Sequence, residues 1–183
     1  MKNNCIQESC TSKICCDTSK LNRKHYMNFD DIVNQAIFND GKKYKHQYRI
    51  PTKILKEYET NILRLKDTIV RCQDFDNILK SVSSVAIKGI GDLTKYDVAF
   101  RMGCAFGIFP DKVYLHAGTK VGAIKLGLVK KYSRKQYLTL DDMPDWLKNV
   151  EPYQIEDFLC IYKKEPTQSN LNEYLLKACG QRT

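Results

Sequence analysis

The stretch Lys88-Gly89-Ile90-Gly91-Asp92 carries the clearest binding chemistry in the sequence. Glycine adopts backbone angles that other residues avoid, and it places no side chain in front of its own amide. The amides of such a turn, and of the first turn of a following helix, lack internal partners and point at solvent with the positive end of the helix dipole behind them. This arrangement binds anions, and on a nucleic acid the anion is a phosphate. The residues predicted to contact nucleic acid are Lys88, Gly89, Ile90, Gly91, Thr94, Lys95 and, further along the chain, Lys120.

A hairpin of this kind needs a helix on each side, and the apolar spacing predicts both. The first runs from about Asp74 to Val85 and the second from about Leu93 to Phe106. Ile90 would pack between them and fix their crossing. The alternative interpretation is an ordinary helix–helix turn that happens to use Gly-Ile-Gly.

The rest of the chain also favours helices, so we predict an all-α helical bundle. Strand signals are few, and Val113-Tyr114-Leu115 is the one short candidate. Residues 1–27 are polar, rich in cysteine and aperiodic, and are interpreted as a tail before a single all-α domain over 28–183. The remaining helices are expected from Asn28 to Asp40-Gly41, Pro51 to about Arg71, Gly118 to Leu126, Asp141 or Asp142 to Trp146, Pro152 to about Lys164, and Leu171 to Cys179.

Composition narrows the class of protein and of partner. The net charge of +9 favours an anionic partner, and nucleic acid is the commonest one. The sequence has no apolar run long enough to cross a bilayer and no apolar stretch at its start, so we expect a soluble, intracellular, cytoplasmic protein without membrane contact. Oligomeric state is left open by the sequence.

Eight cysteines raise the question of disulfides and metals. Without an export signal disulfides are not expected, and the spacing of Cys5, Cys10 and Cys15 does not match a structural zinc site. We therefore predict no metal and no cofactor; the alternative is a metal held by these cysteines, with His25 as a further ligand. Cys72, Cys104 and Cys160 lie among apolar residues and are interpreted as small core residues.

A second basic segment precedes the first long helix. Lys42-Lys43-Tyr44-Lys45-His46-Gln47-Tyr48-Arg49 mixes cations with aromatic rings. Such a stretch can follow phosphates while its rings stack on bases. The alternative interpretation is a solvated loop.

Several motifs together resemble the helix-hairpin-helix DNA glycosylase superfamily over about residues 74–127. They are Ile87-Lys88-Gly89-Ile90-Gly91, Thr94, Ala105-Phe106-Gly107-Ile108, Pro110 and Val113-Tyr114-Leu115-His116. The resemblance implies an all-α bundle and a DNA partner, held through its backbone phosphates, with a pocket for a flipped base. Tyr114 would line that pocket.

The sequence departs from the family at two catalytic positions. Leu93 stands where bifunctional members have the lysine that forms a Schiff base, and Tyr114 stands where nearly all members have an aspartate. Binding of DNA, in repair or base recognition, is therefore expected more strongly than catalysis. One alternative is an active glycosylase or lyase with a relocated site formed by Asp111, His116 and Lys95. Another is a protein-interaction module that keeps the fold without binding DNA.

Overall fold

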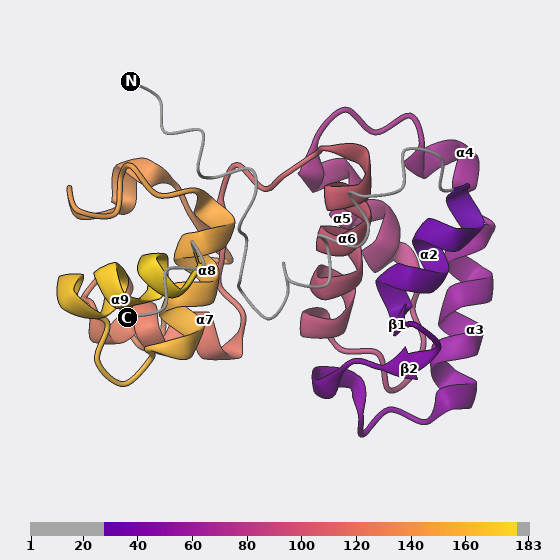
Figure 1. The fold of residues 1–183 in the computed structure, drawn as a ribbon, viewed down its shortest axis with the longest axis horizontal. Helices are drawn as coiled ribbons and strands as arrows, with labels where there is room; N and C mark the ends of the chain where they lie inside the picture. Colours follow the sequence, from indigo (N-terminus) through magenta and orange to yellow (C-terminus); the bar gives the residue numbers. More distant parts are fainter. Residues whose placement is uncertain (1–27, 179–183) are drawn as a thin grey trace. The chain divides into compact units, whose positions relative to one another are not determined.

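The computed structural model describes residues 28–178, and they form two compact units, 28–109 and 110–178 (Figure 1). The predicted tail, residues 1–27, lies outside the described residues. The two units meet along the sequence at Phe109 and Pro110, and the single domain over 28–183 stays a prediction. The described part is mostly helical, with two small antiparallel pairs of strands. None of its helices is long and apolar enough to cross a membrane.

The first unit is built around α6, a helix from Asp92 to Phe106. Its residues from Tyr96 to Cys104 are all buried, because α5 and α2 pack against it. The other elements, in chain order, are α2 (Phe29–Ile37), β1 (Phe38–Asn39), β2 (Lys42–Lys43), the 3-10 turn η2 (Lys45–Gln47), α3 (Thr52–Leu63), α4 (Lys66–Ile69) and α5 (Phe75–Ser84).

The polar residues before α2 and α5 cap these helices, and the cap at Asn28 was predicted. Asn28 Oδ1 accepts a hydrogen bond from the amide of Asp31 at 2.9 Å, and Asp74 Oδ1 accepts one from the amide of Asn77 at 2.8 Å. Each bond satisfies an amide that the helix itself leaves without a partner.

Two boundaries in this unit differ from the prediction. The first helix ends at Ile37 rather than near Gly41, because Asp40 and Gly41, both with positive φ, form the turn between β1 and β2. The expected continuous helix from Pro51 is interrupted at Arg64 and Leu65, which separate α3 from α4.

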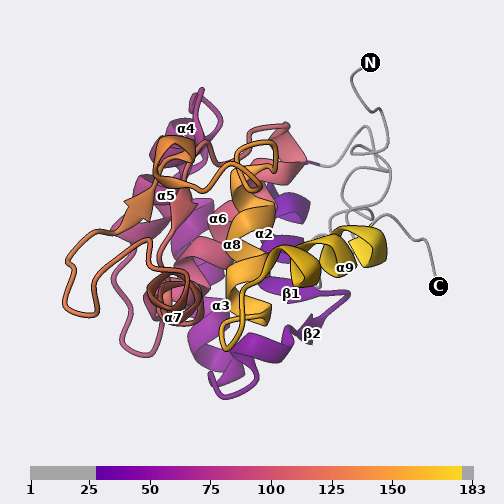
Figure 2. The ribbon, with the colours of Figure 1, turned by 90° about the vertical axis from the view of Figure 1, so that its left-hand side faces the viewer.

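The second unit consists of β3 (Val113–Tyr114), α7 (Ala117–Lys125), β4 (Tyr137–Leu138), the 3-10 turn η3 (Leu140–Asp142), α8 (Pro152–Ile161) and α9 (Gln168–Ala178). α7 crosses α8 at a steep angle, as Figure 2 shows. The approach is close because Gly122 presents no side chain there, and a Cβ at that position would clash with the backbone oxygen of Leu159. Buried Thr119 donates from its hydroxyl to Glu156 Oε1 at 2.8 Å across the same contact.

The predicted strand in this unit is present, but its partner was not anticipated. Val113 pairs with Leu138 and Tyr114 with Tyr137, in antiparallel register. The helix expected from Asp141 or Asp142 to Trp146 is wrong. A 3-10 turn ends at Asp142 instead, because Met143, which precedes Pro144, is extended. The carboxylate of Asp142 caps the start of this turn by accepting from the amide of Thr139 at 2.9 Å.

Candidate nucleic-acid interface

The link between α5 and α6, residues 85–91, contains one tight turn, at Lys88 and Gly89. Gly89 has φ +100°, which residues with a Cβ rarely adopt. The amide of Ile90 donates to the carbonyl of Ile87 at 3.1 Å, and the Ile90 side chain is buried at 7% exposure, as the sequence predicts. Gly91 precedes the first helical residue in an extended conformation and gives α6 no side-chain cap.

The turn presents mainly backbone and cations to solvent. Lys88, Gly89 and Gly91 are exposed, and Lys95 is half-buried. A Cβ built on Gly91 would meet no atom within 4 Å, so the space in front of this residue is open. Of the predicted contact residues, Ile90 and Thr94 do not share this surface, because both are buried in the unit.

The N-terminal turn of α3 lies beside the hairpin. Ile54 Cγ2 is 3.8 Å from the position that a Cβ of Gly89 would occupy. Every charged side chain between Asp40 and Glu57 is a cation, so the chain that leads into α3 is strongly basic. Within it Lys42, Lys45, His46, Tyr48 and Arg49 are exposed, and Tyr48 reaches 69% exposure.

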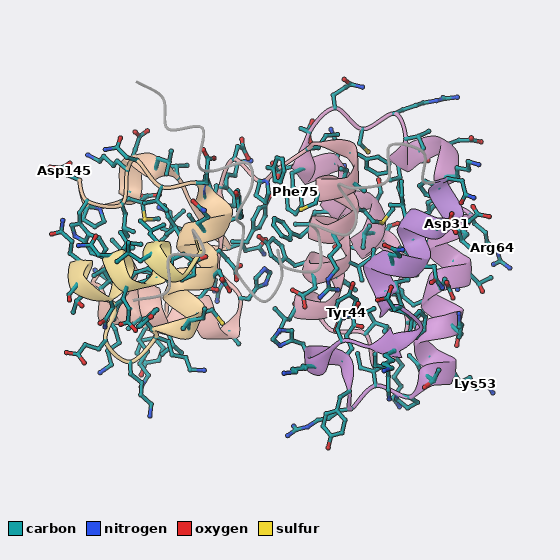
Figure 3. All side chains as sticks on the ribbon, in the orientation of Figure 1. Asp31, Tyr44, Lys53, Arg64, Phe75 and Asp145 are labelled. Atoms are coloured by element: carbon teal, nitrogen blue, oxygen red, sulfur yellow. The ribbon has the colours of Figure 1, made fainter. Side chains whose placement is uncertain are left out.

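Buried contacts hold this basic segment on the unit. The Arg101 guanidinium carbon lies 3.5 Å from the centre of the Tyr44 ring, and Arg101 Nη1 donates to the carbonyl of Ala36 at 2.9 Å. Lys43 Nζ donates to the carbonyls of Tyr48 and Ile50 at 2.9 and 3.0 Å. The exposed side chains therefore project from a backbone that is fixed at several points; Tyr44, one of these points, is labelled in Figure 3.

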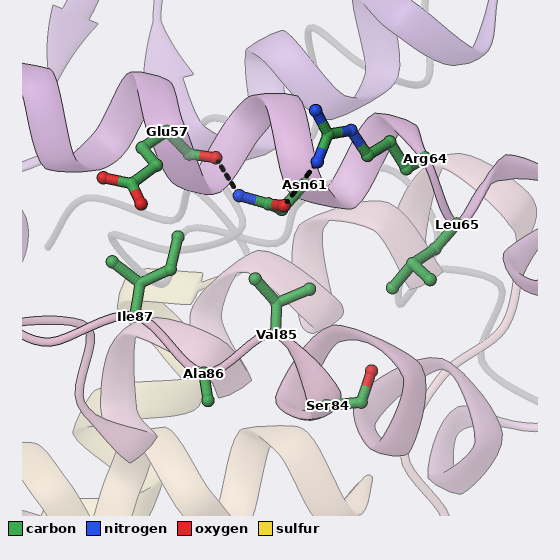
Figure 4. A pocket seen from close by; sticks show the side chains of 8 residues that line it. All are labelled: Glu57, Asn61, Arg64, Leu65, Ser84, Val85, Ala86 and Ile87. Atoms are coloured by element: carbon green, nitrogen blue, oxygen red, sulfur yellow. Dashed lines mark hydrogen bonds between the residues drawn. The ribbon is translucent and has the colours of Figure 1, made fainter.

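A pocket of about 460 Å³ opens between α3 and the residues that precede the hairpin (Figure 4). On the α3 wall, Arg64 Nη1 donates to Asn61 Oδ1 at 3.2 Å, and Asn61 Nδ2 donates to the carbonyl of Glu57 at 2.9 Å. The opposite wall is the chain from Ser84 to Ile87, directly before Lys88. Sequence reasoning did not find this pocket, because it depends on how α3 packs against a segment some 20 residues further along.

The three residues predicted for a relocated catalytic site are divided between the units. Lys95 belongs to the first unit, and Asp111 and His116 belong to the second. Asp111 is exposed, with one carboxylate oxygen 3.9 Å from Lys112 Nζ. His116 is the residue before α7, and its carbonyl accepts from the amide of Lys120 at 2.7 Å.

The remaining predicted residues of the second unit make structural contacts. Tyr114 is buried in β3, with its ring 6.4 Å from that of Tyr137. Lys120 Nζ donates to the carbonyl of Ser133 at 2.6 Å. Leu93, in the first unit, is 43% exposed at the position where the family lysine is expected.

The cysteines and other ligand types do not gather into a metal site in the part of the chain that the structure describes. The predicted tail cysteines lie outside it. Cys104 is buried as expected, and burial raises the pKa of its thiol to about 12. Cys72 and Cys160 are only half-buried, so the prediction that they are core residues holds less well for them.

The chain was compared with protein-family models, with curated proteins and with solved structures, and none of them matches it.

Proposed function

We propose that this protein binds nucleic acid, with DNA as the expected form, through the end of the first unit that carries the α5–α6 hairpin. The observation that carries the proposal is the hairpin itself. Its glycines leave backbone open to solvent, Ile90 anchors it, and Lys88 and Lys95 stand on either side. In this proposal the turn is a helix-hairpin-helix element that grips the phosphate backbone.

The chemistry of the turn suits a phosphate group. The first amides of α6 have no partner within the helix, and Gly91 supplies no side-chain oxygen to take their place. Backbone amides at a helix N-terminus favour an anion, and lysines add a charge that draws it in. Asp92 places a carboxylate in the same turn, and its charge repels a phosphate. The two lysines are therefore needed to keep the electrostatic potential of the site favourable for an anion.

The basic segment before α3 supports the same proposal. It leads directly into α3, whose Ile54 approaches Gly89, and its exposed cations would extend the positive surface. Contacts of this kind position a protein on a strand without reading its sequence. We therefore propose backbone binding, and the exposed Leu93 gives no amine for lyase chemistry.

The experiment is charge reversal at the two lysines. Lys88→Glu combined with Lys95→Glu is compared with Arg71→Glu combined with Lys80→Glu, which changes the charge equally at exposed positions before and within α5. Affinity for a labelled DNA duplex is measured over a series of salt concentrations. The hairpin variant should bind far more weakly, and the slope of log affinity against log salt should fall by about 2.

The control variant should keep most of the affinity and the original slope. If both variants lost the same amount of DNA affinity, the interaction would depend on net charge alone, and the proposal would be overturned. Unchanged affinity in the hairpin variant, with retained circular dichroism, would also overturn it.

A further inference from the structure

We infer that the second unit carries its own contact for single-stranded nucleic acid, formed by the loop at residues 128–136 with Tyr132 as a platform on which bases stack. We name this segment the Tyr132 loop. The inference goes beyond the hairpin proposal and does not depend on it, because every residue that it uses lies in the other unit.

Charge is the first observation. Every charged side chain between Asp111 and Asp141 is a cation. Those that lie in the Tyr132 loop are all exposed, namely Lys130, Lys131, Arg134 and Lys135. Lys135 is committed to Asp142 at 2.8 Å, so Lys130, Lys131 and Arg134 remain to attract a polyanion. A groove or loop with this excess of one sign raises the local concentration of oppositely charged ligands.

The second observation is the aromatic ring among these cations. Tyr132 is 88% exposed, more than the other exposed large apolar side chains in the part of the chain that the structure describes. Lys131 Nζ lies 5.7 Å from the centre of its ring. A ring bordered by cations offers a flat face to a base and a charge to the phosphate beside it.

The third observation is that the loop backbone is held in place. The amide of Ser133 donates to the carbonyl of Lys130 at 2.9 Å, which closes a turn around Tyr132. Lys120 Nζ donates to the carbonyl of Ser133 at 2.6 Å, and Val129 is buried in the core of the unit. A platform that is already ordered loses less conformational entropy when a ligand binds.

These observations together favour single strands over other anionic partners. An acidic peptide would use the cations and leave the ring with no specific partner. The bases of a duplex are stacked on one another, so their faces are closed to a side chain. Unpaired bases use both features at once, and stacking of this kind tolerates any base sequence.

The experiment measures how much of the affinity comes from bases. The full-length chain is titrated with a labelled oligothymidylate of about 12 nucleotides and with an abasic oligomer of equal length. Tyr132→Ala should weaken oligothymidylate binding by about 5- to 150-fold, the range expected for one stacked base, and change abasic binding little. Tyr132→Phe keeps the ring and should bind like the parent. Since Tyr132 is exposed, thermal unfolding should be unchanged in both variants.

A second pair of variants tests the charges. Lys130→Gln with Lys131→Gln should weaken binding to both oligomers, and by more than Lys163→Gln with Lys164→Gln, which removes the same charge from exposed positions after α8. All titrations are repeated in the variant that carries Lys88→Glu and Lys95→Glu. The hairpin proposal fails on its results with duplex DNA, whereas the present inference fails on its results with single-stranded oligomers, so the two failures are distinguishable.

Four results would overturn the inference. One is equal affinity of the parent for the two oligomers. Another is a Tyr132→Ala variant that binds oligothymidylate as tightly as the parent, or that loses both oligomers equally. The last is an equal loss in the two lysine pairs, which would mean that net charge alone is responsible.

Discussion

Arg101 Nη2 lies 3.6 Å from Asp97 Oδ2, one turn away on α6, and both side chains are 1% exposed. Within the described residues neither oxygen of Asp97 has a hydrogen-bond donor. Burial raises the pKa of Asp97, while the charges of Arg101 and His46 act in the opposite direction. Arg101 also contacts Tyr44 and Ala36, so this pair ties the basic segment and α2 to the central helix.

Removing the arginine alone should be costly. Arg101→Met leaves Asp97 buried without its counter-charge, and we expect the free energy of unfolding to fall by about 3–5 kcal/mol. Adding Asp97→Leu should restore a large part of this, because two apolar side chains can replace a buried pair. Urea unfolding is measured for the parent, for Arg101→Met, for Asp97→Leu and for the double variant, which together form a double-mutant cycle. A double variant less stable than Arg101→Met would contradict the expectation.

The same variant should show a characteristic pH dependence. Without Arg101, burial is opposed by the smaller effect of His46 and raises the pKa of Asp97 above the value in the unfolded chain. The folded chain then takes up its proton at higher pH than the unfolded chain does, so acid favours folding at this site. The stability deficit of Arg101→Met should therefore shrink as the pH falls toward about 4. A deficit that grows over this range would be the opposite of what is expected.

The two hairpin glycines should respond differently to alanine. Gly89→Ala forces a Cβ onto a residue with φ +100°, which should cost about 1–3 kcal/mol of stability. Gly91 has φ −90°, and a Cβ there would meet open space. Gly91→Ala should therefore lower the free energy of unfolding by only about 0.5–1 kcal/mol, because alanine is the poorer N-cap residue. If the amides hold phosphate, Gly91→Ala should still lose about tenfold or more in duplex affinity. Thermal unfolding and titration with duplex DNA are measured for both variants. If Gly91→Ala kept the full affinity of the parent, the phosphate would not bind at the amides beside Gly91.

The contact between α7 and α8 should not tolerate a methyl group. In Gly122→Ala the new Cβ meets the backbone of Leu159, which can yield only if the helices separate. We expect a loss of about 1–3 kcal/mol, even though alanine is the better helix former. Val121→Ala, on the exposed side of the same helix, should change stability by about 0.5 kcal/mol or less. Denaturant unfolding followed by circular dichroism tests the pair, and equal stabilities would show that the helices can separate at little cost.

Asp142 should contribute to stability only where it is ionised. Its hydrogen bonds to Lys135 and to the amide of Thr139 lower its pKa below the ordinary range. When the pKa of a carboxyl is lower in the folded chain than in the unfolded chain, the ionised group stabilises the fold. This stabilisation is fully present above the pKa of the unfolded chain, about 3.9, and is lost as the pH falls through the pKa of the folded chain. Asp142→Asn should therefore destabilise the fold by about 1 kcal/mol or less at pH 7, because the pair is partly exposed, and should lower the melting temperature slightly there. The effect should be smaller at about pH 3, below the unfolded pKa. If Asp142→Asn destabilised the fold equally at both pH values, the loss would come from packing and not from the charge of Asp142.

Local signals in the sequence predicted much of the fold. Helix starts at Asn28, Asp74 and Pro152 follow from capping and proline rules that act within one turn, and the structure confirms them. The burial of Ile90 was also predictable, because an apolar residue between two glycines and two amphipathic helices has little else to pack against.

Features that depend on distant residues were not predictable in the same way. β3 was found from its composition, but its partner Tyr137–Leu138 gives no strong signal of its own. Arg101 and Asp97 are charged, and nothing local reveals that α6 is covered on every side. The acid-free run around Tyr132 could have been read from the sequence, whereas the exposure of its ring and the bond from Lys120 to Ser133 required the folded chain.

Lys43 and Lys120 each use an ammonium group to hold the carbonyls of a nearby loop. Acetylation of such a lysine removes the charge and leaves a single N–H donor, so Lys43 could no longer hold both Tyr48 and Ile50. At most surface lysines the same modification would only weaken the attraction for a polyanion. At Lys43 it would also release one of the two loop carbonyls, so that an enzyme acting on this lysine would change the shape of the surface as well as its charge.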